Sequence, residues 1–312
     1  MQALFAVILP VFLVLGAGYL AVWLRYLDEE AIDQLMRFAQ GVAIPTLLFL
    51  GVTKLDLAQA LKPGLFLSFY AGALAAFVIG GLAARFVFGR PGPDSVAIGF
   101  ACLFSNTLLL GVPITERAYG PDALAPNYAL IAIHSPVMYA FGITAMEWVK
   151  SHGHDLSASH ILRRILSGLV RNPLIIGITL GFAVNLSGLA LPEPVAAAFE
   201  MIARAGLPAA LFGLGGVLVR YRPEGDLRLV AMVAVLSLVL HPCLTYLLAT
   251  HYYGLSIPEL RSATVTAAMA PGINAYLFAH MYGVGKRVAA TSVLICTAAS
   301  ILTVWFWLQL LP

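Results

Sequence analysis

Two apolar stretches that lie far apart in the chain combine polar side chains with residues that break helices. The first, Ser105–Pro113, reads SNTLLLGVP, and the second, Ala270–Asn274, reads APGIN. Proline removes a backbone donor and clashes with the preceding turn, and glycine weakens a helix, so each stretch predicts a helix that breaks near its middle. A half-helix that begins at such a break presents amide donors and a favourable dipole to an anion. The residues predicted to form this anion site are Asn106, Thr107, Pro113, Pro271, Gly272 and Asn274.

Either break taken alone has a structural alternative, because helices tolerate proline where neighbouring groups satisfy the freed backbone. Two breaks at corresponding positions favour binding. His134, which precedes Ser135 and Pro136, adds an imidazole that can carry a coupling proton or hydrogen-bond a carboxylate. We expect it to interrupt its helix, as we expect of His241 before Pro242. A neutral imidazole beside a loosened carbonyl is favoured for His241, whereas both interpretations stay open for His134.

Two further features involve ionisable residues and prolines inside apolar segments. Arg204 lies near the middle of one segment, and Glu200 is four residues earlier, so the two side chains can pair along one helix face. Either this pair is self-contained, or Arg204 balances the charge of an anion or contributes to coupling. Pro45 and Pro208 occur in matching phrases, IPTLLF and LPAALF, without a polar cluster, which favours a scaffold or hinge role.

The sequence predicts no cofactor and no metal site. It contains no Walker, Rossmann, nucleophile-elbow or zinc-hydrolase pattern, so it offers no means of using ATP. His152, His154 and His160 fall in a polar loop without cysteine, and the three cysteines are scattered through apolar runs. A membrane-embedded enzyme with His134 or His241 as a general base is an alternative, but no paired nucleophile supports it.

The elements that must position these groups are membrane helices. Of the 312 residues, 61% are hydrophobic and 11% are charged, against roughly 45–50% apolar and about 25% charged in soluble domains. The net charge of +3 is explained by loop lysines and arginines, so nucleic acid is not implied. With about 20 apolar residues needed for each crossing, ten spans are predicted near 3–24, 31–53, 63–89, 95–119, 122–149, 172–188, 194–219, 227–253, 259–283 and 288–311.

The chain contains an internal repeat. Pro10, Gly18, Pro45, Leu48 and Phe49 recur 163 positions later as Pro173, Gly181, Pro208, Leu211 and Phe212. The predicted five-span repeats are 1–150 and 172–312, joined by a linker with an amphipathic segment at 151–171. Loops after odd-numbered spans carry twelve Lys and Arg residues against four on the other side, which predicts cytoplasmic odd loops, including the central one, and external termini. Because each repeat has an odd number of spans, the repeats are predicted to be inverted, as in many secondary transporters.

These features together resemble the auxin efflux carrier family, which includes plant PIN proteins and bacterial malonate-type carriers. The motifs that carry the resemblance are Gly16-x-Gly18-Tyr19, Ile44-Pro45 with Leu48-Phe49, Asn106 with Gly111-x-Pro113, and Ala270-Pro271 with Asn274. The resemblance implies a scaffold domain from spans 1, 2, 6 and 7 and a transport domain from spans 3–5 and 8–10. It also implies that broken spans four and nine cross, that an organic anion binds near the crossing, and that the scaffold forms a homodimer. The short loop Lys150–His160 departs from many plant members and indicates a compact bacterial carrier.

We therefore expect an all-α integral protein of the bacterial cytoplasmic membrane. It is predicted to be a secondary transporter that moves a small organic carboxylate, malonate-like or indole-acetate-like, by alternating access with an elevator-like displacement. H+ or Na+ is the expected coupling ion, and membrane lipid surrounds the helices. One rival is a sodium-coupled bile-acid-type symporter, which the lack of a dense cluster of acidic and amide residues disfavours. The other is a receptor that binds an organic anion without transporting it.

Overall fold

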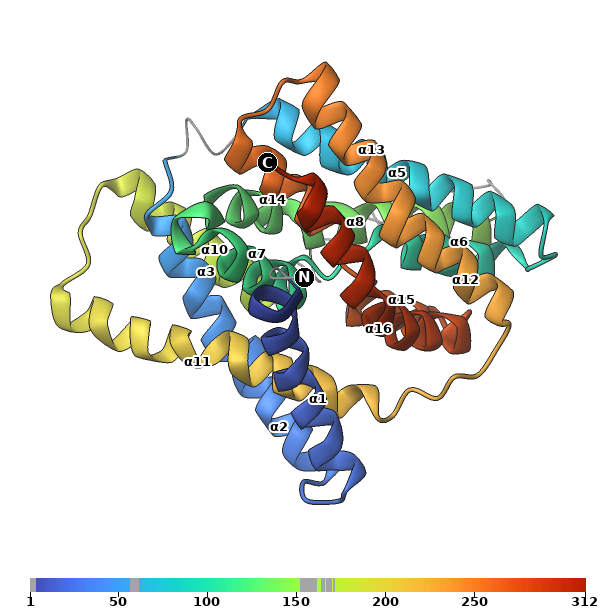
Figure 1. Ribbon diagram of the computed structural model, residues 1–312, viewed down its shortest axis with the longest axis horizontal. Helices are drawn as coiled ribbons and strands as arrows, with labels where there is room; N and C mark the ends of the chain where they lie inside the picture. Colours follow the sequence, from blue (N-terminus) through green and yellow to red (C-terminus); the bar gives the residue numbers. More distant parts are fainter. Residues whose placement is uncertain (1–3, 57–61, 152–161, 164–165, 167–169, 171) are drawn as a thin grey trace. The chain divides into compact units, whose positions relative to one another are not determined.

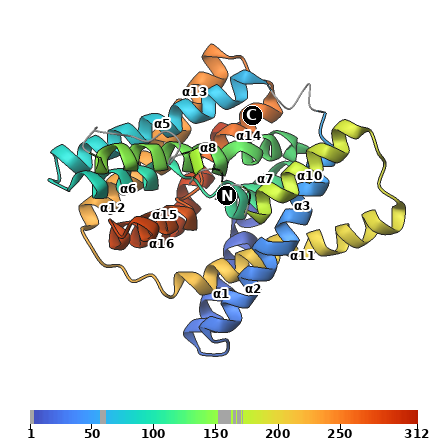
Figure 2. The same cartoon turned by 180° about the vertical axis from the view of Figure 1, so that it is seen from behind.

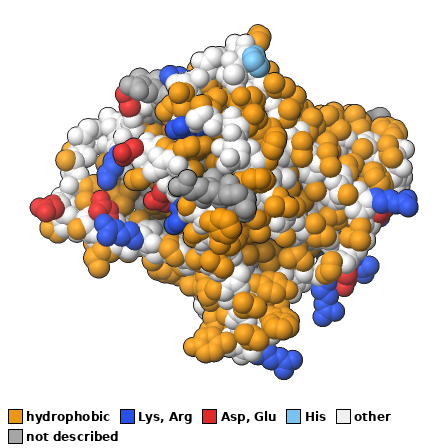
Figure 3. Space-filling model, in the orientation of Figure 1, with side chains coloured by type: hydrophobic (Ala, Val, Ile, Leu, Met, Phe, Trp, Pro, Cys, Tyr) orange, Lys and Arg blue, Asp and Glu red, His pale blue; other side chains and the backbone are white. Residues whose placement is uncertain are grey.

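The computed structural model describes residues 4–56, 62–151, 162–163, 166, 170 and 172–312. The described residues form helices, turns and loops and no strand, as expected of an all-α membrane protein. Figure 3 shows hydrophobic side chains over most of the visible face and few charged ones. The predicted linker at 151–171 lies largely outside the described residues, as do its amphipathic segment and the three histidines of the polar loop, His152, His154 and His160.

Seven helical segments in the described part of the chain are long and apolar enough to span a membrane. They are Phe5–Trp23, Glu29–Thr53, Pro63–Phe86, Pro121–Lys150, Glu193–Leu218, Leu227–Tyr252 and Lys286–Leu310. The protein is therefore an integral membrane protein. Each of the other three predicted spans lacks a single long helix. The helix of the sixth span has only 15 residues, and the helices of the fourth and ninth spans are interrupted. The arrangement as ten spans in inverted repeats stays a prediction.

The chain forms two compact units, and each unit draws on both halves of the sequence. The large unit comprises Met1–Ile8, Lys62–Ile165 and Tyr221–Pro312, and the small unit comprises Leu9–Leu61 and Leu166–Arg220. The small unit thus contains the segments of predicted spans one, two, six and seven. The scaffold and transport roles predicted for the two sets of spans are treated below as a proposal.

The described residues of the small unit form five α-helices. They are α1 (Leu9–Trp23), α2 (Glu29–Phe38), α3 (Ile44–Thr53), α10 (Pro173–Ser187) and α11 (Glu193–Leu218), with a π-helical turn, η2 (Ala39–Ala43), between α2 and α3. Helix α1 packs against α11, and α3 packs against α10 (Figures 1 and 2). Glycines allow this close approach, since a Cβ at Gly18 would overlap the carbonyl oxygen of Phe212, and one at Gly181 would lie 2.8 Å from that of Phe49.

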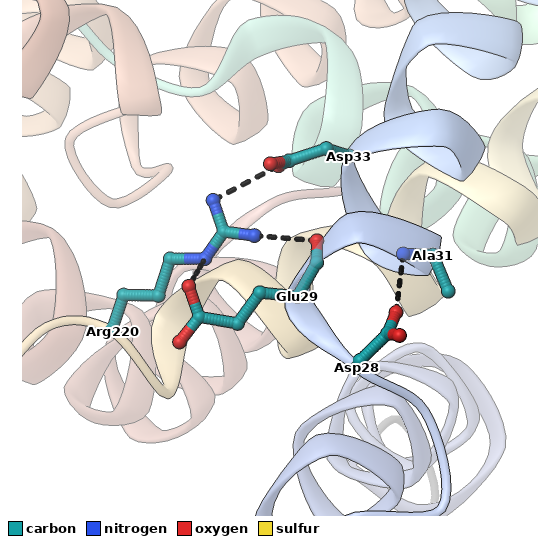
Figure 4. Close-up of polar contacts among 5 residues, drawn as sticks. All are labelled: Asp28, Glu29, Ala31, Asp33 and Arg220. Atoms are coloured by element: carbon teal, nitrogen blue, oxygen red, sulfur yellow. Dashed lines mark hydrogen bonds and ion pairs between the residues drawn. The ribbon is translucent and has the colours of Figure 1, made fainter.

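Arg220 follows α11 and ties the end of that helix to α2 (Figure 4). Its Nη1 lies 2.9 Å from Asp33 Oδ1, its Nε lies 3.2 Å from Glu29 Oε2, and its Nη2 donates to the carbonyl of Glu29 at 2.7 Å. Asp28 caps α2 by accepting from the amide of Ala31 at 2.7 Å. Acidic residues in the first turn also suit the positive end of the helix dipole. The polar end of α2 is therefore held by one arginine from the other half of the chain.

The large unit contains the remaining helices. They are η1 (Leu4–Ile8), α5 (Pro63–Phe86), α6 (Gly92–Leu103), η3 (Thr107–Gly111), α7 (Val112–Tyr119), η4 (Pro121–Leu124), α8 (Ala125–Lys150), α12 (Leu227–Val235), η5 (Leu236–Leu240), α13 (His241–Leu247), η6 (Leu248–Tyr252), α14 (Ile257–Ala267), α15 (Ile273–Tyr282) and α16 (Lys286–Leu310). Helix α5 packs against both α6 and α13 (Figures 1 and 2). In the core of the unit, the rings of Phe100 from α6 and Phe278 from α15 stack with centroids 3.9 Å apart. This core joins the two helices that flank the predicted breaks.

The predicted interruptions at His134–Pro136 and at His241–Pro242 are wrong. Helix α8 continues from Ala125 to Lys150 with Pro136 inside it. His241 begins α13 directly after the π-helical turn η5, which itself continues α12. A local π-helical turn relieves the clash of a proline with the preceding turn, and packing against neighbouring helices stabilises what remains. Both helices therefore pass their prolines without a break.

Candidate functional site

The fourth predicted span is broken where the sequence indicates. Helix α6 ends at Leu103, the chain leaves the helical path through Phe104–Asn106, and it resumes at Thr107 as η3 and then α7. The side-chain Oδ1 of Asn106 accepts from the amide of Leu109 at 3.2 Å and so caps η3. Pro113 is the second residue of α7, which continues directly from the π-helical turn η3, and this turn accommodates the missing donor. Asn106, Thr107 and Pro113 are all buried.

The ninth predicted span is broken in the same way. Helix α14 ends at Ala267, and α15 begins at Ile273, with Ala268–Gly272 between them. Pro271 and Gly272 are buried in the break, and Gly272 directly precedes the first turn of α15. Asn274 is the second residue of α15 and is partly buried. The two predicted stretches thus both contain the helix interruptions expected of them.

The two breaks complete each other's backbone hydrogen bonds. The amide of Asn106 donates to the carbonyl of Ala270 at 2.8 Å, and the amide of Gly272 donates to the carbonyl of Phe104 at 2.9 Å. Ser105 and Pro271 form an isolated antiparallel bridge between these bonds. Backbone groups freed inside a membrane require such partners. The structure therefore brings Asn106, Thr107, Pro271 and Gly272 into one place, and Asn274 follows directly in α15.

The side-chain oxygens of the two asparagines are both engaged. Oδ1 of Asn106 holds the amide of Leu109, and Oδ1 of Asn274 accepts from the hydroxyl of Tyr139 at 3.3 Å. The group that each asparagine still offers a ligand is therefore its NH2 donor. Tyr139 comes from α8 and was missed in the sequence, because a single tyrosine in an apolar helix carries no local signal. Donors without competing acceptors suit an anion.

His134 lies beside the break in the fourth span. Its ring centroid is 4.7 Å from that of Phe104, 5.6 Å from Phe69 and 6.1 Å from Tyr70. The imidazole is fully buried, and neither ring nitrogen has a hydrogen-bond partner among the described residues. The hydroxyl of Ser105 is likewise buried without a partner in that part of the chain. We call the three rings around His134 the aromatic cage. It could not be predicted from the sequence, because α5 supplies two of its members.

Asn127 forms a second buried polar cluster that the sequence analysis missed. Its Nδ2 donates to Thr115 Oγ1 at 3.2 Å and to Thr266 Oγ1 at 2.9 Å. Its Oδ1 accepts from Ser262 Oγ at 2.7 Å. These residues tie α8 to α7 and α14, the helices on either side of the paired breaks. Because every side-chain group of Asn127 has a partner, the cluster stabilises the fold around the site.

The other predicted site residues lie in the small unit. Arg204 is exposed on α11, and the expected pair with Glu200 is absent, although both residues are described. Glu200 instead lies 3.5 Å from Lys54 Nζ, at the end of α3, because the long lysine side chain reaches it from a neighbouring helix. Pro45 is buried at the start of α3, and Pro208 is exposed inside the continuous helix α11. Within the described residues no three His, Cys, Asp or Glu side chains gather to hold a metal ion.

The apolar spanning helices and the paired breaks define an α-helical integral membrane protein of many spans. A family model described as "Membrane transport protein" matches residues 3–308, and the chain belongs to that family, which confirms the resemblance to auxin efflux carriers at the family level. A protein of Rhizobium meliloti (strain 1021) named "Putative malonate transporter" is 23% identical over 305 residues, which cover 97% of this chain and 94% of that protein. The protein is therefore a membrane transporter and not an enzyme.

Proposed function

We propose that this protein is a secondary carrier that moves a small organic carboxylate across the bacterial cytoplasmic membrane. The observation that carries the proposal is the pair of hydrogen-bonded breaks. At these breaks the side-chain oxygens of Asn106 and Asn274 are engaged, and their NH2 groups have no hydrogen-bond acceptor among the described residues. Two neutral donors suit a carboxylate, because they bind the anion without binding it so tightly that release is prevented. The name of the Rhizobium meliloti relative supports malonate as the first ligand to test.

In this proposal the residues of the breaks divide the work. Asn106, Thr107 and Asn274 bind the carboxylate, while Pro113, Pro271 and Gly272 keep the helices interrupted at that depth. Arg204 of the small unit balances the charge of the anion along its path, since an arginine within a spanning helix is costly unless it serves such a role. Pro45 and Pro208 belong to the frame, and Glu200 has an exposed partner in Lys54 and no role at the site.

The mechanism that we propose is alternating access by ten spans in two inverted repeats. The large unit acts as the transport domain and the small unit as the scaffold, with an elevator-like displacement between them and a homodimer formed through the scaffold. Inverted repeats supply two related conformations of similar energy that open to opposite sides. The termini lie outside and the central loop lies in the cytoplasm, as the distribution of basic residues predicts.

The experiment that tests the proposal is transport by the purified protein in liposomes. Uptake of radiolabelled malonate, other small carboxylates and indole-3-acetate is measured with pH or sodium gradients. We expect saturable uptake that Asn106→Ala and Asn274→Ala each reduce at least about tenfold, the loss of one hydrogen bond to a charged group. Gln309→Ala, which removes an exposed amide of α16, is the matched control.

Three outcomes separate the proposal from its rivals. Uptake that requires sodium and ignores pH favours a sodium-coupled symporter. Binding of a carboxylate without uptake identifies a receptor. A folded protein that neither binds nor moves any of these anions overturns the assignment.

A further inference from the structure

His134 is a buried group beside the paired breaks that can change its charge, and its ring nitrogens lack hydrogen-bond partners within the described part of the chain. Its ring is fully enclosed, and neither nitrogen has a hydrogen-bond partner among the described residues. A buried polar group normally has one, so an orphaned imidazole calls for an explanation. Free side-chain nitrogens in an enclosed site can accept a proton without displacing an existing bond.

The aromatic cage encloses this imidazole, and one of its rings stacks on it. Phe104 and Phe69 meet the His134 ring nearly edge-to-face, at interplanar angles of 66° and 75°, and Tyr70 stacks on it at 18°. The stacked Tyr70 ring turns its face to the imidazole at 6.1 Å, about the distance over which an aromatic face attracts a cation. This ring offsets part of the cost of a buried positive charge, but it supplies no counter-ion.

The other titratable groups around His134 are already engaged. The Tyr70 hydroxyl donates to the carbonyl of Leu130 at 3.3 Å. His241 faces the Phe69 ring from α13 at 4.9 Å, and its Nε2 lies 3.2 Å from the carbonyl of Phe69. No ion pair of the described residues includes either histidine. With no acidic partner for it among the described residues, a charge on His134 stays unpaired until an anion arrives at the adjacent break.

We propose that His134 is the proton-coupling group of the carrier. It binds one proton for each organic anion that binds at the paired breaks. The proton adds to the imidazole from the side to which the site is open, and it leaves with the anion on the other side. No covalent bond to the anion forms. Because each charge stabilises the other in a low-dielectric site, anion and proton bind together. This inference rests on the proposed function, and it assigns the coupling ion as H+.

Proton uptake on ligand binding tests this assignment. The purified protein in weak buffer is mixed with malonate at a pH where free malonate is fully ionised, and a pH indicator reports protons taken up. We expect about one proton per malonate bound and an affinity that rises up to about tenfold for each unit of pH decrease. His134→Gln should bind malonate without proton uptake, and in liposomes it should exchange malonate but fail to accumulate it when driven by a pH gradient.

Two further variants keep the test decisive if His134→Gln does not fold. His241→Gln changes the neighbouring imidazole and should retain proton uptake. Tyr70→Leu removes the stacked ring of the cage without changing His134 and should shift proton uptake to lower pH. Malonate binding by the wild-type protein without proton uptake overturns the inference but leaves the carrier proposal standing, as does loss of proton uptake in His241→Gln alone. Failure to bind any carboxylate overturns both.

Discussion

Gly18 lies against the backbone carbonyl of Phe212, and its repeat partner Gly181 lies against that of Phe49. Phe212 is itself the repeat partner of Phe49, so the same contact occurs twice with the two halves of the chain exchanged. The predicted inverted repeats would produce an exchange of this kind. The glycines are therefore required at the points where α1 meets α11 and α10 meets α3.

Valine at Gly18 or Gly181 should destabilise the small unit. A Cβ at either position would meet backbone atoms that no side-chain rotation can move, and overpacking of this kind costs about 1–3 kcal/mol or more. Thermal unfolding in detergent, followed by fluorescence-detected size exclusion, measures the change. Gly16→Val is the control, because a Cβ there meets no atom within 4 Å. Equal unfolding temperatures for Gly16→Val and Gly18→Val would contradict this account of the packing.

Replacing Asn127 by leucine should destabilise the large unit. The change leaves the hydroxyls of Thr115, Ser262 and Thr266 without their partner, and each unsatisfied buried group costs about 1–3 kcal/mol. We expect a lower unfolding temperature and reduced uptake at all pH values. Thr144→Val on the same helix removes only an exposed hydroxyl bonded to its own helix and should be nearly neutral. A stable Asn127→Leu protein would show that the cluster contributes little to stability.

The ion pair of Lys62 with Glu259 should matter far more than that of Lys54 with Glu200. Lys62 Nζ lies 2.8 Å from a Glu259 carboxylate whose side chain is only 8% exposed, whereas the Lys54 pair is separated by 3.5 Å with side chains 72% and 44% exposed. Lys62→Met leaves a buried carboxylate with less compensation, at a cost of about 1–3 kcal/mol. Lys54→Met should change stability by less than about 1 kcal/mol.

Unfolding temperatures at low and high salt measure both variants. Salt should reduce the difference between wild type and Lys54→Met, because exposed pairs are screened, and should affect the Lys62 pair less. A larger loss of stability in Lys54→Met than in Lys62→Met would show that side-chain exposure does not determine how much each ion pair contributes to stability.

Arg204→Gln should slow transport without destabilising the protein. Arg204 is exposed and has no ion-pair partner among the described residues, so its removal breaks no contact there. If it balances the charge of the anion, initial malonate uptake should fall several-fold, and the effect of salt on uptake should weaken. Arg37→Gln, which removes an exposed arginine of α2, is the control. Unchanged uptake with a higher unfolding temperature would indicate that Arg204 is merely a costly charge in the membrane.

The sequence predicted the features that depend on local chemistry and missed those that depend on distant partners. The breaks at Asn106 and Pro271 follow from helix breakers in an apolar stretch, and both are present. The interruptions expected near Pro136 and Pro242 are wrong, because tertiary packing and a π-helical turn accommodate a proline that the sequence alone treats as a breaker. Sequence spacing also allowed Arg204 to pair with Glu200, whereas the structure supplies Lys54 as the partner of Glu200.

The aromatic cage and the Asn127 cluster show the same limit. Each joins side chains from helices that are far apart in the sequence, and no periodicity within one helix indicates which residues will meet. His134 was identified from its chemistry alone, since an imidazole in an apolar helix is rare and costly. The aromatic rings that surround His134 come from other helices and are known only from the folded structure.

Each unit of this protein is completed by segments from both halves of the chain, and each helix break donates one backbone hydrogen bond to the other half. A polypeptide of half the length would leave both sets of contacts unmade. An ancestral single-repeat protein could therefore have folded only as two copies, and the predicted topology requires that the copies entered the membrane in opposite directions. Fusion of the two genes would have removed the need to insert one sequence in both directions, after which each half was free to acquire its own loop charges.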